Sequence, residues 1–300
     1  MADQTAATKP EERKKRDGPV VVSVINLKGG VGKTTVTALL ADYAVRMGLK
    51  VLAIDLDPQA NLTQGLMDKW EYRTFMDPKM ERKSIADVFC SYSGDGEKMH
   101  RDKVAASLRR WRIPTGDDTR GLLIPSHFAF ADTLIRPLQE TKERALADFV
   151  NEHKGDRELI LIDCAPTESV LTRAAYRASD YILIPAKTAY LATIGFPLLR
   201  QSLEDFKKDA DGHDIQICGV LINYIGTSTA AKNKERVSIR RKAAKYGWHV
   251  FAGEMEEAAG FEKWPTPEMG YLGTKYLKIF RPIAQDIMER LGLWHEQEEL

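Results

Sequence analysis

Apolar residues recur along the chain in short continuous runs that alternate with stretches of helical periodicity. The first run, residues 20–25, is almost entirely β-branched and apolar, which is typical of a strand buried on both faces. Further on, Val36, Leu39 and Tyr43 follow the spacing of one helix face, and Gly48 stands where a helix C-cap belongs. The other apolar runs are 50–54, 121–124, 158–162, 181–184, 215–222 and 248–251. This alternation predicts an α/β fold, with a doubly wound, mostly parallel sheet of about seven strands flanked by helices.

A glycine-rich loop joins the first predicted strand to the first predicted helix. It consists of Lys28, Gly29, Gly30, Val31, Gly32, Lys33, Thr34 and Thr35. Glycines at a strand-to-helix turn let backbone N–H groups converge on phosphate oxygens, and the helix N-terminus adds partial positive charge. In this setting Lys33 is placed to neutralise nucleotide phosphates and the Thr34 hydroxyl is a natural Mg²⁺ ligand. The alternative is a glycine-rich turn in which Lys33 is merely solvated.

Whole-chain properties set the limits for any function. The 300 residues are 43% apolar, enough for one substantial core, and the net charge of +1 means that any affinity for nucleic acid needs a local basic patch. Cys90, Cys164 and Cys218 lie far apart without a C-x-x-C pair, which argues against a zinc site. No apolar run approaches 18 residues, so we expect a cytoplasmic protein.

The expected organisation is an N-terminal arm followed by one domain. Residues 1–18 are basic and poor in apolar side chains, which predicts a disordered arm or a plain solubilising tail. Residues 19–300 are expected to form a single domain, with a variable accessory region at 67–120. Within that region the pattern of residues 104–111 favours a helix.

The glycine-rich loop departs from the ordinary P-loop, G-x-x-x-x-G-K-[ST], because a lysine leads it and the first glycine is missing. It resembles the deviant Walker A motif of the ParA/MinD family of ATPases. This resemblance implies that the chain binds ATP and Mg²⁺ as a homodimer. Lys28 would then reach the phosphates of the partner's nucleotide, and residues 28–35 would hold the chain's own nucleotide.

Three acidic residues follow predicted strands, at the edge of the sheet where α/β folds bind ligands. Asp55 and Asp57 follow residues 50–54 in a stretch similar to the DxDPQ-N-T pattern of ParA proteins, and Asp163 opens a D-x-x-P segment after residues 158–162. The resemblance implies that Asp57 positions the attacking water while Asp55, Asp163 and Thr34 manage Mg²⁺, so that Lys28, Lys33 and Asp57 form the catalytic set. A helix N-cap is the alternative for either Asp55 or Asp57.

Adenine recognition and DNA contact are the remaining expected roles. Asn223 ends the strand at 215–222, where the resemblance implies a contact with the adenine edge, and a satisfied turn asparagine is the alternative. A predicted helix then carries the densest basic run of the chain: Lys232, Lys234, Arg236, Arg240, Arg241, Lys242 and Lys245. Such a stripe binds phosphates without reading sequence, although most charge runs are solvated helix faces.

The chain departs from ParA proteins at residues 252–260, where a basic residue is missing and acidic residues stand instead. The expected cycle is that of an ATP-bound dimer on nonspecific double-stranded DNA, with a ParB-like or adaptor protein stimulating hydrolysis, so that plasmids, chromosomes or another cargo are positioned. Nucleoid association would follow from DNA binding. The alternatives are a switch acting on a protein complex, and a MinD-like membrane switch, which the acidic residues 295–300 disfavour.

Overall fold

A computed structural model describes residues 18–77, 79–80, 83–91, 109–110, 121–131, 140–188, 195–209, 212–223, 230–255 and 274–294. The predicted N-terminal arm lies outside the described residues except for Gly18. Much of the accessory region at 67–120 lies outside them as well, so its expected role is not tested by the structure.

Seven strands form one sheet in the order β3-β4-β2-β5-β1-β6-β7. They are β1 (Val20–Val24), β2 (Val51–Asp55), β3 (Arg109–Arg110), β4 (Gly121–Ile124), β5 (Leu159–Asp163), β6 (Tyr181–Lys187) and β7 (Gln216–Asn223). All neighbouring strands run parallel except β3, which pairs antiparallel with β4 at the edge. The predicted doubly wound, mostly parallel sheet is therefore confirmed.

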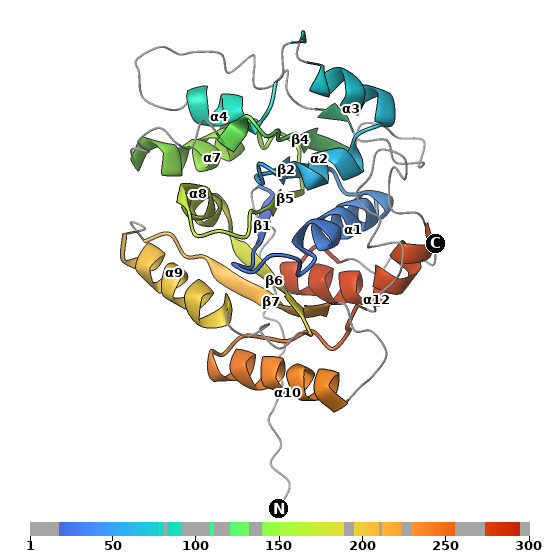
Figure 1. Cartoon of the computed structure of the whole chain (residues 1–300), viewed down its shortest axis with the longest axis vertical. Helices are drawn as coiled ribbons and strands as arrows, with labels where there is room; N and C mark the ends of the chain where they lie inside the picture. Colours follow the sequence, from blue (N-terminus) through green and yellow to red (C-terminus); the bar gives the residue numbers. More distant parts are fainter. Residues whose placement is uncertain are drawn as a thin grey trace, which may run out of the picture.

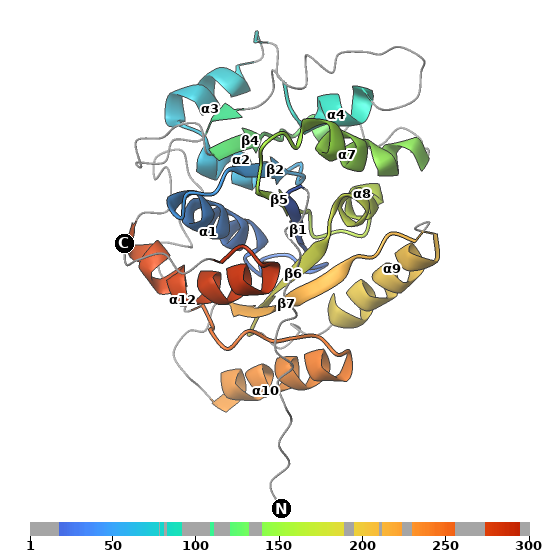
Figure 2. The same ribbon diagram turned by 180° about the vertical axis from the view of Figure 1, so that it is seen from behind.

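Helices cover both faces of the sheet (Figures 1 and 2). They are α1 (Lys33–Arg46), α2 (Asn61–Leu66), α3 (Lys69–Met76), α4 (Ile85–Ser91), α7 (Glu140–His153), α8 (Val170–Ala178), α9 (Gly195–Asp209), α10 (Ala230–Lys245) and α12 (Thr274–Leu291). One apolar core lies under α1 and α12, and a second lies under α7, α8 and α9. Val20, Val22 and Val24 point into the first core while Val21 and Ile25 point into the second, because side chains alternate along a strand.

Two expected elements differ from the structure. Arg109–Arg110 is a short edge strand, not part of a helix over 104–111, because pairing with Leu122 and Leu123 of β4 overrides the local helical pattern. The run 248–251 is reduced to one parallel bridge between Val220 and Val250. Two residues earlier in β7, Arg290 of α12 donates to the Cys218 carbonyl (2.8 Å), which takes the place of further strand pairing there.

Asp42 is a charged residue inside the packed face of α1. It is 3% exposed, its Oδ1 accepts a hydrogen bond from Arg46 Nε (3.2 Å), and its Oδ2 has no partner among the described residues. Burial raises the pKa of Asp42 to about 6, against the opposing charge of Arg46. Because this pKa exceeds that of the unfolded chain, the folded protein binds the proton more tightly, and stability from this group is lost as pH rises from 4 to 6.

Asp42→Asn is therefore expected to stabilise the protein near pH 7, by about 2 to 3 kcal/mol at most, and to have no effect near pH 4. The measurement is urea unfolding of both proteins across this pH range. Asp205→Asn is the matched control, since hydrogen bonds from Lys208 and Gln201 lower the pKa of this exposed carboxyl. A gain that is equal at all pH values would show that the titration of Asp42 is not its cause.

Candidate nucleotide site

The glycine-rich loop leaves the sheet at the end of β1 and passes directly into α1. Gly30 (φ 70°) and Gly32 (φ 87°) adopt left-handed backbone conformations, which glycine reaches without steric cost. A Cβ atom at Gly29 or Gly30 would meet nothing within 4 Å, and both residues are exposed. The loop therefore presents bare backbone to solvent at the N-terminus of a 14-residue helix, as an anion-binding turn requires.

Asn26 fixes this loop, and its role was not foreseen from the sequence. Its Nδ2 donates to the Pro185 carbonyl of β6 (2.8 Å), and its Oδ1 accepts from the Lys28 backbone N–H (3.0 Å). Gly195, at the start of α9, packs so closely that a Cβ there would lie 2.7 Å from Asn26 Oδ1. The only indication in the sequence was that Asn26 is a polar residue directly after a predicted buried strand, and this position does not reveal its hydrogen-bond partners.

The two predicted lysines differ in environment. Lys33 is 7% exposed and its Nζ donates to the Lys28 carbonyl (3.2 Å), which curls the loop around the ammonium group. Burial lowers the pKa of Lys33, while the nearby carboxylates of Asp163 and Asp57 act in the opposite direction. Lys28 itself is only partly buried. Lys33 is therefore the internal cation of the site, and Lys28 stands at its rim.

Asp55 and Asp163 end neighbouring strands at the same register position of the sheet. Both are fully buried, and burial together with the Asp55 charge raises the pKa of Asp163 well above its ordinary value. Asp163 Oδ1 accepts a hydrogen bond from the Thr37 hydroxyl (3.4 Å), and the Thr34 side chain also bonds this carboxyl. Its Oδ2 is buried with no partner among the described residues.

Asp55 organises the loop that follows β2. Its Oδ2 accepts from both the backbone N–H (2.8 Å) and the hydroxyl (2.7 Å) of Thr63, whose Oγ1 in turn accepts from the Ser126 N–H (2.8 Å). Its Oδ1 accepts from the Asp57 N–H (3.2 Å). Burial raises the pKa of Asp55 to about 7. In this structure Asp55 supports Asp57, and its predicted place in the Mg²⁺ shell stays a prediction.

Asp57 lies beside the glycine-rich loop in a tight turn. It is 8% exposed, and its Oδ1 accepts from the Gln59 N–H (2.9 Å). The turn ends at Ala60, whose φ of 55° makes it the one non-glycine residue with left-handed backbone among those described. Ala60 is also the N-cap residue of α2, so neither Asp55 nor Asp57 holds that position, although Asp55 accepts the Thr63 N–H in the first turn of this helix.

Asn223, at the end of β7, contacts the glycine-rich loop. It is fully buried and its Nδ2 donates to the Val31 carbonyl (3.0 Å), while its Oδ1 has no partner among the described residues. The structure therefore links β7 to the phosphate-binding turn through this side chain. Adenine recognition by Asn223 is not tested and stays a prediction.

The predicted basic stripe lies on α10, the outermost element beyond edge strand β7 in both views (Figures 1 and 2). Ile239 and Ala243 are fully buried and anchor the helix on the sheet. Among the seven basic residues Lys234, Arg241 and Lys245 are exposed, Arg236, Arg240 and Lys242 are half-buried, and the side chain of Lys232 lies outside the described residues. Arg236 and Arg240 form ion pairs with Glu254, a partner that the sequence did not indicate.

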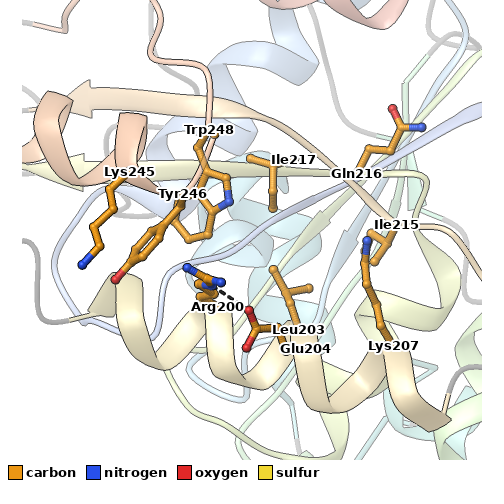
Figure 3. A pocket seen from close by; sticks show the side chains of 11 residues that line it. Arg200, Leu203, Glu204, Lys207, Ile215, Gln216, Ile217, Lys245, Tyr246 and Trp248 are labelled. Carbon is orange, nitrogen blue, oxygen red and sulfur yellow. Dashed lines mark hydrogen bonds and ion pairs between the residues drawn. The ribbon is translucent and has the colours of Figure 1, made fainter.

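A hollow of about 480 Å³ lies between α9, the start of β7 and the end of α10 (Figure 3). The Arg200 guanidinium lies 4.9 Å from the Tyr246 ring centroid and pairs with Glu204 at 2.6 Å. Lys207, on the same rim, pairs with Asp214 at 3.6 Å. This hollow contains none of the predicted nucleotide-site residues, and its charges are largely compensated within the chain.

The donor set at the strand ends fits a magnesium ion. Mg²⁺ prefers hard oxygen ligands, and the buried Oδ2 of Asp163 and the nearby Thr34 hydroxyl supply them. Within the described residues no three His, Cys, Asp or Glu side chains gather into a metal-binding group. Mg²⁺ usually takes one or two protein ligands and completes its shell with water and phosphate, so the oxygens of Asp163 and Thr34 are sufficient.

Together the buried Lys33, the glycine turn and the carboxylates of β2 and β5 define a P-loop nucleoside triphosphatase site. A family model described as AAA domain matches residues 20–217, and the chain belongs to this family. With the lysine that leads its loop, it is a ParA/MinD-type ATPase.

Relatives and solved structures resemble the chain over most of its length. The chromosome-partitioning ATPase Soj of Thermus thermophilus is 26% identical over 273 residues, covering 90% of this chain and 96% of that protein. The structure of pNOB8 ParA bound to nonspecific DNA has a TM-score of 0.70 at 21% identity, covering 91% of this chain and 99% of that one. Cobyrinic acid a,c-diamide synthase from Mycobacterium smegmatis, with bound ATP analog and magnesium, has a TM-score of 0.67 at 23% identity, covering 89% and 93%. These structural likenesses establish the fold.

Two further features are the buried cysteines and the length and polarity of the helices. Cys164 and Cys218 are buried in the apolar cores, and burial raises the pKa of the Cys164 thiol. Among the described helices, none is both long and apolar enough to cross a bilayer.

Asn223→Ala is expected to weaken ATP binding about fivefold, because the variant loses the hydrogen bond to Val31 that supports the glycine-rich loop. Since this support acts on the phosphates, GTP should lose the same factor. The measurement is titration of both nucleotides against both proteins. If the variant weakens ATP alone, Asn223 recognises adenine and its contact with Val31 is secondary.

Proposed function

We propose that the chain is a Mg²⁺-dependent ATPase that works as a nucleotide-dependent dimer switch. The observation that carries this proposal is the buried Lys33, held between the glycine-rich loop and the carboxylates of Asp57 and Asp163. A buried ammonium group on an open backbone turn is a phosphate site, and an acidic residue beside it supplies a place for water.

Catalysis consists of positioning and charge neutralisation. The phosphate oxygens of ATP replace the Lys28 carbonyl as the acceptor of Lys33 Nζ. Backbone N–H groups of residues 29–35 hold the phosphates at the α1 N-terminus. Asp57, fixed by the Gln59 N–H and by its own N–H to Asp55, orients the attacking water. Thr34 and Asp163 would hold a Mg²⁺ ion, which would supply charge neutralisation at the phosphates.

The exposed rim of the nucleotide site supports dimerisation. Gly29 and Gly30 leave the loop surface bare, so a second subunit can approach the nucleotide closely. Lys28 stands at this rim, only partly buried, and in the ATP-bound sandwich it reaches the partner's phosphates. Each subunit thereby completes the other's site, which makes dimer formation depend on ATP.

The ATP-bound dimer binds nonspecific double-stranded DNA through α10, and a ParB-like or adaptor protein stimulates hydrolysis and release. The exposed Lys234, Arg241 and Lys245 support this assignment, as does the solved ParA structure described as bound to nonspecific DNA. The cycle positions a plasmid, a chromosome or another cargo, in the manner that the name of the Thermus relative indicates for that protein.

A second candidate is a dimer switch that acts on a protein complex without touching DNA. It is favoured by one observation: Glu254 already pairs with Arg236 and Arg240, so its single negative charge offsets part of the positive charge on α10. Both candidates share the ATPase site and the dimer, and they differ only in what the ATP-bound dimer binds.

Lys28→Ala is expected to retain ATP binding but to lose ATP-dependent dimerisation, because Lys28 acts across the interface while Lys33 holds the chain's own nucleotide. The measurement is sedimentation velocity with ATP and with ADP, alongside nucleotide titration. Lys50→Ala is the matched control, because Lys50 is also partly buried and lies directly before β2, where it pairs with Asp156. Unchanged ATP-dependent sedimentation in Lys28→Ala would contradict the sandwich arrangement.

DNA binding is tested by titrating a nonspecific duplex with ATP, with ADP and without nucleotide across a NaCl series. At physiological salt we expect binding with ATP alone, and at low salt weaker binding without nucleotide as well, with affinity falling steeply as salt rises because Lys and Arg displace counterions from phosphates. Arg241→Glu/Lys245→Glu should abolish it. Lys69→Glu/Arg73→Glu makes the same charge change on α3, at the opposite end of the molecule (Figure 1), and should retain it. Absence of binding in every nucleotide state would reject the DNA assignment and leave the second candidate.

A further inference from the structure

Glu254 lies between two arginines that are one turn apart on α10. Its side chain is 8% exposed, its Oε1 accepts a hydrogen bond from Arg240 Nη2 (2.7 Å), and its Oε2 pairs with Arg236 Nη2. The two arginine side chains remain 34% and 42% exposed. The two ion pairs therefore lie at the protein surface, where a second anion can reach the same guanidinium groups.

The segment that carries Glu254 is held in place from both sides. A Cβ atom at Gly253 would lie 2.7 Å from Ile283 Cγ1 of α12, so glycine is needed for this close packing. On the other side, the Met255 N–H donates to the Ile222 carbonyl of β7 (2.9 Å), and the Met255 side chain is fully buried. The carboxylate is therefore fixed in position, and the flexible members of the cluster are the two arginines.

The same segment leads to the nucleotide site. Ile222, which accepts from Met255, directly precedes Asn223, and Asn223 donates to Val31 of the glycine-rich loop. A continuous set of contacts thus joins the phosphate-binding turn, the end of β7 and the Glu254 carboxylate that pairs with α10. A change of the loop on nucleotide binding has a physical route to the Glu254 pairs through these contacts.

We propose that Glu254 is an internal counter-ion that competes with DNA phosphates for Arg236 and Arg240, and so suppresses DNA binding by the nucleotide-free protein. The inference rests on the proposed DNA-binding function and names the residue that regulates it. Carboxylate and phosphate oxygens seek the same guanidinium donors, so Glu254 lowers the affinity of each arginine for DNA phosphates. While Glu254 holds them, α10 offers DNA a smaller positive charge than its sequence implies.

The test is DNA titration of Glu254→Gln, which keeps the shape of the side chain and removes its charge. Without nucleotide, the variant should bind a nonspecific duplex about fivefold more tightly than the parent at low salt, since two arginines are released. The slope of log affinity against log salt should steepen by about 1 to 2 units, one for each additional phosphate contacted. The affinity ratio between the ATP-bound and nucleotide-free states should shrink.

Two variants control for general charge effects. Glu235→Gln removes one negative charge from α10 itself, but among the described residues Glu254 is the carboxylate that pairs with Arg236 and Arg240. It should change the affinity less than Glu254→Gln and leave the salt slope unchanged. Glu254→Asp keeps the charge and should stay close to the parent. Equal gains from Glu235→Gln and Glu254→Gln would overturn the proposal.

A second measurement keeps Glu254 intact, in case its replacement destabilises the fold, which thermal unfolding and ATP titration would reveal. Arg241 is exposed and has no carboxylate partner among the described residues, whereas Arg240 is paired with Glu254. In the nucleotide-free protein at low salt, Arg241→Gln should therefore weaken DNA binding more than Arg240→Gln does. Equal or reversed losses would overturn the counter-ion role.

Failure of the inference is distinguishable from failure of the proposed function. If the parent protein binds DNA with ATP but Glu254→Gln leaves affinity and salt slope unchanged, the counter-ion role alone is rejected. If neither protein binds DNA in any nucleotide state while both still bind ATP, the DNA assignment is rejected and the inference falls with it.

Discussion

The in-register ends of β2 and β5 are the constraint on which the site depends. They place Asp55 and Asp163 side by side, fully buried, next to the buried ammonium group of Lys33. Buried charges without partners are costly, so each carboxylate needs hydrogen-bond donors or a neighbouring cation. Asp55 obtains its donors from Thr63 and Asp57, whereas Asp163 keeps one oxygen without a partner among the described residues. Asp55 is therefore a structural carboxylate, whereas Asp163 has an oxygen available to a ligand.

Much of this site was predictable because its determinants are local in the sequence. Continuous β-branched runs predict buried parallel strands, and the residues directly after such strands meet at one edge of the sheet. Lys33, Asp57 and Asp163 were therefore found from their positions after strands, and the structure brings them together. The glycines with left-handed backbone, Gly30 and Gly32, were likewise marked by residue type alone.

The unpredicted parts depend on contacts between residues far apart in the chain. Asn26 bonds Pro185, Asn223 bonds Val31, and Glu254 pairs with the arginines of α10, and no local pattern encodes any of these partners. The edge strand β3 was missed for the same reason, since pairing with β4 outweighs a local helical pattern. Sequence periodicity fixes elements, whereas polar partners are decided by the assembled fold.

The same reasoning explains why the fold alone does not decide the function. Solved structures with this architecture include a ParA described as bound to nonspecific DNA and an amide synthase described with an ATP analog and magnesium. One fold can carry different functions, because function is set by the site and the surfaces built on the fold. In this chain the distinguishing surface is α10, where the basic charge of the helix is partly balanced by Glu254. Since the Glu254 segment contacts β7 one residue before Asn223, the surface that separates the candidate functions is joined to the phosphate-binding loop.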